Sequence, residues 1–102
     1  MPGVVRIGDS LSTGHGCESE TELENSNQGV DNVYANNLLI SVEGADTVAH
    51  SFPPDPPCNP HVAQLNTGSA TVKINYIKVG RIGDSADAGA MSSGSTTVFA
   101  GP

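Results

Sequence analysis

The feature that most constrains the fold is a short motif that recurs along the chain. Residues 5–10 read Val-Arg-Ile-Gly-Asp-Ser, and residues 80–85 match them at five of the six positions. A looser copy at residues 42–47 lies between them, so that the aspartates fall at positions 9, 46 and 84. Repetition at a nearly constant spacing indicates equivalent structural units. Each aspartate is expected to accept backbone N–H groups where a strand ends in a turn.

A second motif recurs in phase with the first and predicts β-hairpins. The pattern Gly-x-x-x-Val-x-apolar starts at positions 29, 68 and 94, with the alternation of a half-buried strand. Asn36-Asn37 and Asn75-Tyr76 follow two of the copies and are suited to hairpin turns. Residues 39–42 and 77–82 then form the expected return strands. The expected interior residues of these strands are Val33, Ala35, Val72, Ile74 and Val98.

The ends of the chain complete this pattern. The first copy lacks an opening strand and the last lacks a return strand, so the two ends are expected to pair and to lie close together. The 102 residues include 12 glycines, two tyrosines, two phenylalanines and no tryptophan, which favours short strands and tight turns around a thin aliphatic core. We therefore predict one all-β domain over residues 1–102, with three units about a pseudo-threefold axis.

The charge of the chain excludes several classes of partner. Eleven acidic and four basic residues give a formal net charge of −7, which argues against nucleic-acid binding and against electrostatic attachment to anionic membranes. No apolar run is long enough for a membrane span, and the first residues are expected to carry no secretory signal. The alternating glutamates at positions 18–24 are expected to form a solvated acidic loop.

Histidine and cysteine residues form the candidate metal site. His15 and His50 follow the repeated aspartates at similar distances, and residues 58–61 have the spacing Cys-x-x-His. Three imidazoles and one thiolate, His15, His50, His61 and Cys58, would form a tetrahedral zinc site. Four protein ligands leave no position for water, so such a site is structural and not catalytic.

The fourth ligand and the metal remain open at this stage. Cys17, two residues beyond His15, and Asp87, which lies where a ligand from the third copy would fall, are the alternatives to Cys58. Iron suits imidazole as well as zinc does. The two cysteines can also form a disulfide, although the sequence favours them as ligands. A nucleophile elbow is absent, so we predict no enzyme, with a zinc-dependent hydrolase using Asp87 as base as the alternative.

The ordered set of motifs resembles the PAAR-repeat proteins over nearly the whole chain. It comprises Arg-Ile-Gly-Asp at 6–9 and 81–84, Gly-His-Gly-Cys at 14–17, Pro-Cys-x-Pro-His at 57–61, Thr-Gly-Ser-x-Thr-Val at 67–72 and Gly-Ser-x-x-Val-Phe-Ala-Gly at 94–101. The chain departs from the family pattern in keeping only the arginine of the Pro-Ala-Ala-Arg signature, and in lacking a cysteine after Asp84.

This resemblance implies a small conical fold with a metal near its apex, whose three histidine ligands correspond to His15, His50 and His61. It implies a tip protein that caps a trimeric β-helical spike, one tip per trimer, and that sharpens the spike for piercing the target cell envelope without stable membrane insertion. A virion location in the baseplate of a contractile phage tail is preferred, with a tip secreted by a type VI system as the alternative.

Overall fold

The computed structural model describes residues 2–26, 33–52 and 59–101, with the backbone alone for 51, 52 and 59. These residues form a small compact domain of short antiparallel strands and contain no helix, as the sequence predicted for an all-β chain. The body is elongated, 41 × 25 × 22 Å. The described strands are β1 (Ser10–Ser12), β2 (Glu20–Glu22), β3 (Tyr34–Ala35), β4 (Leu38–Leu39), β5 (His50–Phe52), β6 (Asn59–His61), β7 (Lys73–Ile74), β8 (Ile77–Lys78), β9 (Ser85–Ala86) and β10 (Gly89–Met91).

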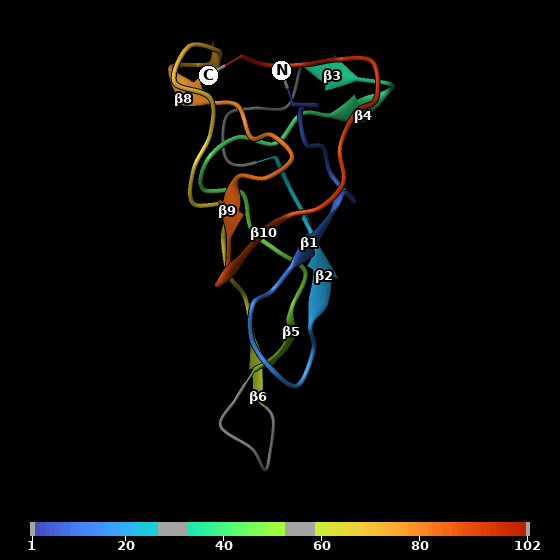
Figure 1. The fold of residues 1–102 in the computed structure, drawn as a ribbon, viewed down its shortest axis with the longest axis vertical. Helices are drawn as coiled ribbons and strands as arrows, with labels where there is room; N and C mark the ends of the chain where they lie inside the picture. Colours follow the sequence, from blue (N-terminus) through green and yellow to red (C-terminus); the bar gives the residue numbers. More distant parts are fainter. Residues whose placement is uncertain (1, 27–32, 53–58, 102) are drawn as a thin grey trace.

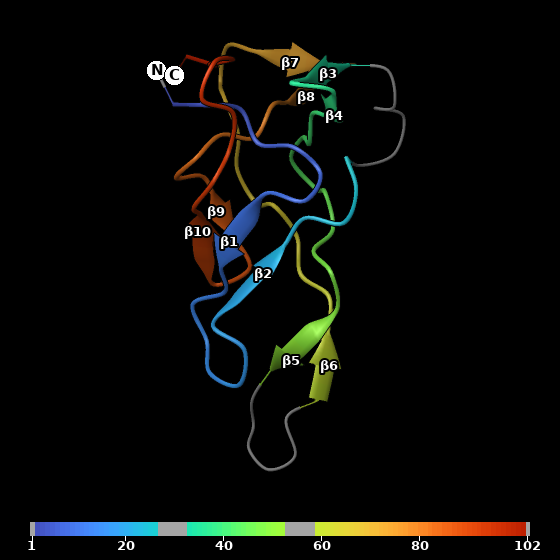
Figure 2. The same ribbon diagram turned by 90° about the vertical axis from the view of Figure 1, so that its right-hand side faces the viewer.

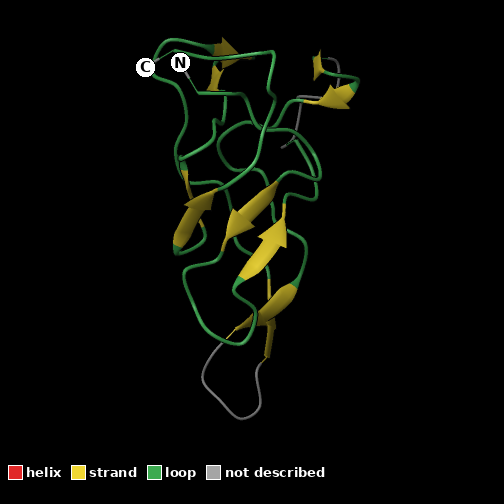
Figure 3. Cartoon of the chain, turned by 45° about the vertical axis from the view of Figure 1, so that its right-hand side comes forward, coloured by secondary structure: helices red, strands yellow, loops and turns green. Residues whose placement is uncertain are grey.

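The strands are arranged along the long axis of the body. The hairpins β3–β4 and β7–β8 lie at the end that carries both termini, and the hairpin β5–β6 lies at the opposite end (Figure 1). Between them is a four-stranded sheet of order β2-β1-β10-β9. Figure 3 shows how much of the chain between these strands is loop. The expected acidic loop is in part wrong, because Glu20–Glu22 is strand β2, paired with β1.

Three tight turns repeat the same geometry. In each, the last residue donates its backbone N–H to the carbonyl oxygen three positions earlier at 3.0 Å: Asp9 to Arg6, Ala45 to Val42 and Asp84 to Arg81. The preceding residue is a glycine with φ between 86° and 95°: Gly8, Gly44 and Gly83. This φ strains any residue with a Cβ. The predicted match of Asp46 with Asp9 and Asp84 is therefore wrong by one residue, because Ala45 takes that place.

Two of the turns are also closed by an ion pair. The carboxylate of Asp9 accepts bonds from the backbone N–H of Arg6 at 2.7 Å and from its guanidinium at 2.9 Å. Asp84 accepts the same bonds from Arg81 at 2.7 and 3.0 Å. The expected role of these aspartates as acceptors at a turn is confirmed at both positions.

Among the described residues the core consists of two aliphatic clusters, as expected for a chain with few aromatic residues. One cluster lies beneath the terminal hairpins and comprises Val4, Ala35, Ile40, Val42, Val79 and Ala100. The second comprises Val5, Leu11, Leu23, Ala45, Leu65, Ala86 and Met91. In the central sheet Leu11 pairs directly with Met91, and both are buried.

Two of the expected interior valines are at the surface. Val72 is 39% exposed and Val98 is 37% exposed, whereas Ala35 is buried as predicted. The backbone N–H of Val72 donates to the Ser69 hydroxyl at 3.0 Å, and Val98 does the same with Ser95 at 2.8 Å. These side-chain bonds turn the chain before the hairpin strand begins, so the alternation predicted from the sequence starts too early.

The predicted pairing of the two ends of the chain is confirmed. Gly3 and Phe99 form an antiparallel bridge, and Ala100 donates its N–H to the Pro2 carbonyl at 3.1 Å. Figure 2 shows the two ends side by side, at the same end of the body as β3 and β7. Among the described residues there is no helix with the length and apolar character needed to cross a bilayer.

Candidate metal centre

Two histidines face each other across the hairpin β5–β6. His50 begins β5 and His61 ends β6, and the two are direct partners in the antiparallel register. Residues opposite one another in such a pair lie close enough for their side chains to touch. The two ring centroids are 4.3 Å apart with the planes at 78°, and the Nε2 atoms are 2.8 Å apart.

A third histidine comes from the loop that follows β1. The start of this loop is held by Thr13, which is buried and whose hydroxyl donates to the Glu18 carbonyl at 2.6 Å. The ring of His15 stacks on that of His50 with centroids 5.2 Å apart and planes within 5°. Its Nε2 atom lies 3.2 Å from the Nε2 atoms of both His50 and His61.

The turn between β9 and β10 supplies a carboxylate. Asp87 has φ 54°, a left-handed conformation that aspartate tolerates better than most residues. Its backbone N–H donates to the Gln64 carbonyl at 3.0 Å, which fixes the turn against the segment that follows β6. Its Oδ2 atom lies 2.7, 2.8 and 3.2 Å from the Nε2 atoms of His50, His15 and His61, respectively.

The four donor atoms form a small tetrahedron. All six distances between them fall between 2.7 and 3.2 Å. An ion held tetrahedrally by nitrogen and oxygen atoms at about 2.0–2.1 Å separates its ligand atoms by about 3.3 Å. The donor atoms, three imidazole nitrogens and one carboxylate oxygen, are therefore arranged as in a tetrahedral metal site but somewhat closer together, by at most about 0.6 Å.

Hydrogen bonds at the other ring nitrogens orient two of the imidazoles. Nδ1 of His15 donates to the Gly16 carbonyl at 2.9 Å, and Nδ1 of His50 donates to the Val48 carbonyl at 2.9 Å. In the neutral ring this leaves the lone pair on Nε2, the atom that points into the cluster. Backbone carbonyls commonly fix metal-binding histidines in this way.

The cluster requires positive charge at its centre. The Nε2 atoms of His15 and His50 lie 3.2 Å apart, and each lies within 2.8 Å of the Asp87 carboxylate. The His50 side chain is fully buried, and those of Asp87 and His15 are 8% and 9% exposed, so water screens them little. Protons or a metal ion can supply this charge. The group His15, His50, His61 and Asp87 can thus hold a metal ion.

The structure brings together the three histidines that the sequence placed in one site. The fourth member is Asp87, which the sequence offered as an alternative, because a carboxylate in the third copy can reach the histidines of the other two. The preferred fourth ligand, Cys58, lies outside the described residues. Cys17, the other alternative, is disulfide-bonded and so has no thiolate to offer. The expectation that the cysteines serve as ligands and not in a disulfide is therefore wrong for Cys17.

Two members of the cluster have shifted pKa values. The bond to the Gly16 carbonyl raises the pKa of His15 above 6.5, against the opposing effect of burial and with a smaller contribution from Asp87. Burial by itself would raise the pKa of Asp87, but the hydrogen bonds from His50, His15 and His61 together lower it below 3.8. Both shifts favour the pair in which histidine is charged and aspartate is ionised.

These shifts predict opposite pH responses with and without metal. Without metal, the stability from His15 is complete below pH 6.5 and is lost as pH rises through its raised pKa, whereas that from Asp87 holds above pH 3.8. With metal, protons compete for the imidazoles, so stability rises with pH. We expect the urea midpoint of chelated protein to fall as the pH rises above 6.5 and that of loaded protein to rise over the same range. Parallel responses would contradict the assignment.

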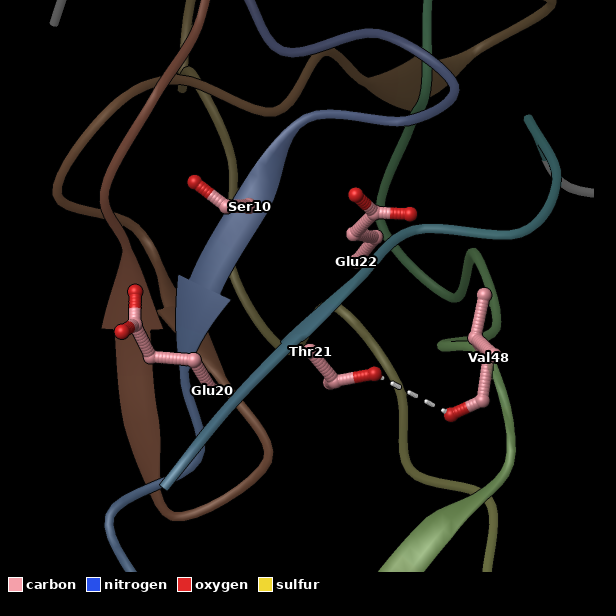
Figure 4. Close-up of a pocket in the computed structure, with 5 residues that line it drawn as sticks. All are labelled: Ser10, Glu20, Thr21, Glu22 and Val48. Carbon is pink, nitrogen blue, oxygen red and sulfur yellow. Dashed lines mark hydrogen bonds between the residues drawn. The ribbon is translucent and has the colours of Figure 1, made fainter. Parts of the chain in front are cut away.

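A shallow hollow lies on the flank of the sheet and includes Val48, whose carbonyl also accepts the Nδ1–H of His50. It is lined by Ser10, Glu20, Thr21, Glu22 and Val48. The Thr21 hydroxyl donates to the Val48 carbonyl at 3.4 Å, and the carboxylates of Glu20 and Glu22 point away from each other (Figure 4). The two acidic groups therefore do not converge on a common ligand.

No model of a known protein family matches the chain. No curated protein matches it either. The resemblance to the PAAR-repeat proteins therefore rests on the sequence motifs alone.

Proposed function

We propose that the protein is a non-enzymatic spike tip of the PAAR type, a small cone that caps a trimeric β-helical spike. The observation that carries this proposal is a closed ring of backbone hydrogen bonds between the three repeats. Val5 donates to the Gly80 carbonyl at 2.9 Å, Gly80 to the Ser41 carbonyl at 3.1 Å and Ser41 to the Val5 carbonyl at 3.0 Å. Bonds that return to their starting residue after three steps are what a pseudo-threefold axis produces.

Further sets of equivalent bonds support the same axis. Each repeat has a strand pair closed by one N–H to carbonyl bond of 2.9–3.0 Å: Ile40 to Val33, Val79 to Val72 and Val4 to Val98. Each turn glycine donates to a buried residue at 2.8–2.9 Å: Gly8 to Leu23, Gly44 to Leu65 and Gly83 to Met91. A base with three similar faces can make three similar contacts with a trimer.

The end of the body with the terminal hairpins supplies a suitable docking face. Its strand pairs and turns expose Tyr34, Leu38, Val72, Tyr76, Val98 and Phe99. Exposed apolar side chains concentrated at one end of a small domain are typical of an interaction surface. Tyr76 is 98% exposed and has φ 68°, a conformation unfavourable for an aromatic residue. Strain of this kind is characteristic of functional positions.

The metal cluster lies in the half of the body opposite the terminal hairpins (Figure 1), and a stabilising metal there fits the proposed role in piercing an envelope. A core with few aromatic residues provides limited stability for a chain of this size, and a structural metal is a common remedy. Here the ion, for which we propose Zn²⁺, would join the β1 loop, the hairpin β5–β6 and the β9–β10 turn. Four protein donors fill a tetrahedral site, which favours a structural ion over the alternative of a zinc hydrolase.

In this proposal the spike tip belongs to the baseplate of a contractile phage tail or, as the alternative, to a type VI secretion spike. The apolar base faces the trimer and the half with the metal faces the target envelope. The acidic chain has no role in nucleic-acid binding.

Binding to a trimeric β-helical spike tests the proposal. We expect one chain per trimer by mass photometry, and we expect Tyr76→Ala to weaken binding about tenfold or more, the usual effect of removing a tyrosine anchor. Val62→Ala is the matched control, because Val62 is also exposed, at 54%, but directly follows the metal-half strand β6. Equal binding by both variants, or the absence of any complex with a trimeric β-helical spike, would argue against the proposal.

A further inference from the structure

The loop that carries His15 is constrained at one point by a covalent bond. Cys17, two residues after His15, is disulfide-bonded and has φ 72°. The residue between them, Gly16, has the carbonyl oxygen that accepts the Nδ1–H of His15 at 2.9 Å and the N–H of Glu18 at 3.0 Å. The peptide group that joins Gly16 to Cys17 is therefore the group that orients the His15 ring.

Other contacts hold the start of this loop, where the N–H of Thr13 donates to the Ser19 carbonyl and the Thr13 carbonyl accepts the N–H of Ala88, both at 2.9 Å. Between Thr13 and Glu20 the described residues form no strand. Gly14 has φ 74° and lies against the backbone of Ala88, which a Cβ would overlap. Gly16, by contrast, has no atoms within 4 Å of the position of a Cβ, so the loop is not packed against the body at this residue. The hydroxyl of Thr13 holds the base of the loop, and the disulfide at Cys17 holds its far side.

We propose that the disulfide at Cys17 sets the metal affinity of the site by positioning the Gly16 carbonyl and hence the His15 ring. Reduction would release the loop that carries His15, one of the four donors, from its covalent constraint. Loss of a group that orients a metal ligand typically lowers metal affinity about 10–100-fold. The inference rests on the metal site of the proposed function and adds a redox dependence to it.

A phosphine and water together supply the electrons and protons needed to reduce the disulfide at Cys17. The phosphine and one water molecule convert the disulfide into two thiols, and the phosphine becomes a phosphine oxide. The disulfide accepts two electrons and two protons, and the water oxygen ends on phosphorus. The sequence contains one other cysteine, Cys58, as an intramolecular partner. Mass spectrometry of a proteolytic digest is expected to find a peptide that links positions 17 and 58, and a disulfide-linked dimer would overturn the proposal.

The test compares Zn²⁺ affinity in the two redox states by competition with a chromophoric chelator. One sample is kept oxidised, and the other is reduced, alkylated with iodoacetamide and freed of reductant, so that no thiol binds the metal. We expect the alkylated protein and Cys17→Ser to bind Zn²⁺ about 10–100-fold more weakly than the oxidised protein. Val62→Ala, with the disulfide intact, should match the wild type.

Two further outcomes separate this inference from the metal site itself. Equal affinity in both redox states would overturn the inference and leave the site intact, whereas no Zn²⁺ binding in either state would remove both. Co²⁺ supplies a readout that loss of stability alone would not change. We expect the visible bands of tetrahedral Co²⁺ without a sulfur-to-metal charge-transfer band in the oxidised protein. Appearance of that band after reduction without alkylation would show a thiolate ligand and overturn a purely positioning role for Cys17.

Discussion

Removal of the metal is expected to lower the melting temperature by about 15 °C or more. Zn²⁺ at a free concentration about 1,000-fold above its Kd stabilises the native state by about 4 kcal/mol. One kcal/mol corresponds to about 4–8 °C in a domain of this size. Calorimetry with and without a chelator measures the effect. A change of less than about 2 °C would contradict a structural metal.

The variant His50→Ala should abolish this metal-dependent increment. The His50 side chain is fully buried, so its removal also leaves a cavity that destabilises the metal-free protein. The informative quantity is therefore the difference between the loaded and the chelated form of each variant, not the melting temperature of either form alone. That difference should fall to near zero in His50→Ala and stay at the wild-type value in Val62→Ala. An unchanged difference in His50→Ala would place the bound metal elsewhere.

Gly89→Ala is expected to produce the second largest effect, a loss of about 2–3 kcal/mol in the free energy of unfolding. A Cβ at Gly89 would overlap the carbonyl group of Ser12, which is backbone and part of the β1–β10 pairing. The strands must separate to accommodate it. Because Asp87 lies two residues before Gly89, the same movement draws the carboxylate away from the histidines, so metal content should fall with stability.

Gly16→Ala provides the matched control for this substitution. No atom lies within 4 Å of the Cβ that it would add, and its backbone carbonyl, which accepts the bond from His15, is retained. The free energy of unfolding should change by less than about 0.5 kcal/mol. Urea titration of the two variants measures both values. A similar loss in both, or none in Gly89→Ala, would contradict the close packing of β1 on β10.

The periodic parts of the fold could be predicted from the sequence because repetition fixes which segments are equivalent. The pairing of Gly3 with Phe99 followed from the incomplete first and last copies. The register of the middle copy could not be predicted in this way. Asp46 looks like the counterpart of Asp9, but the requirement for a positive φ places Gly44 opposite Gly8. Backbone conformation, and not side-chain identity, decides that alignment.

The site was predictable to the extent that it depends on the repeats. His15 and His50 occupy similar places in two copies, and the antiparallel register of β5 and β6 adds His61. The third copy has Asp87, and not a histidine, where its ligand is expected, so the histidine pattern does not identify it. Only the three-dimensional position of its turn shows that Asp87 completes the cluster. The state of Cys17 could not be predicted either, because the spacing of two cysteines fits a disulfide as well as a ligand pair.

The bridge between Gly3 and Phe99 has a consequence for how the protein forms. The strand pair that completes the third repeat joins the first and last segments of the described chain, so the ring of repeats closes only after nearly all of this sequence has left the ribosome. Folding of such a chain is dominated by distant pairings and is expected to take milliseconds to seconds. We therefore expect cooperative, post-translational folding, in which no repeat is stable before the others are present.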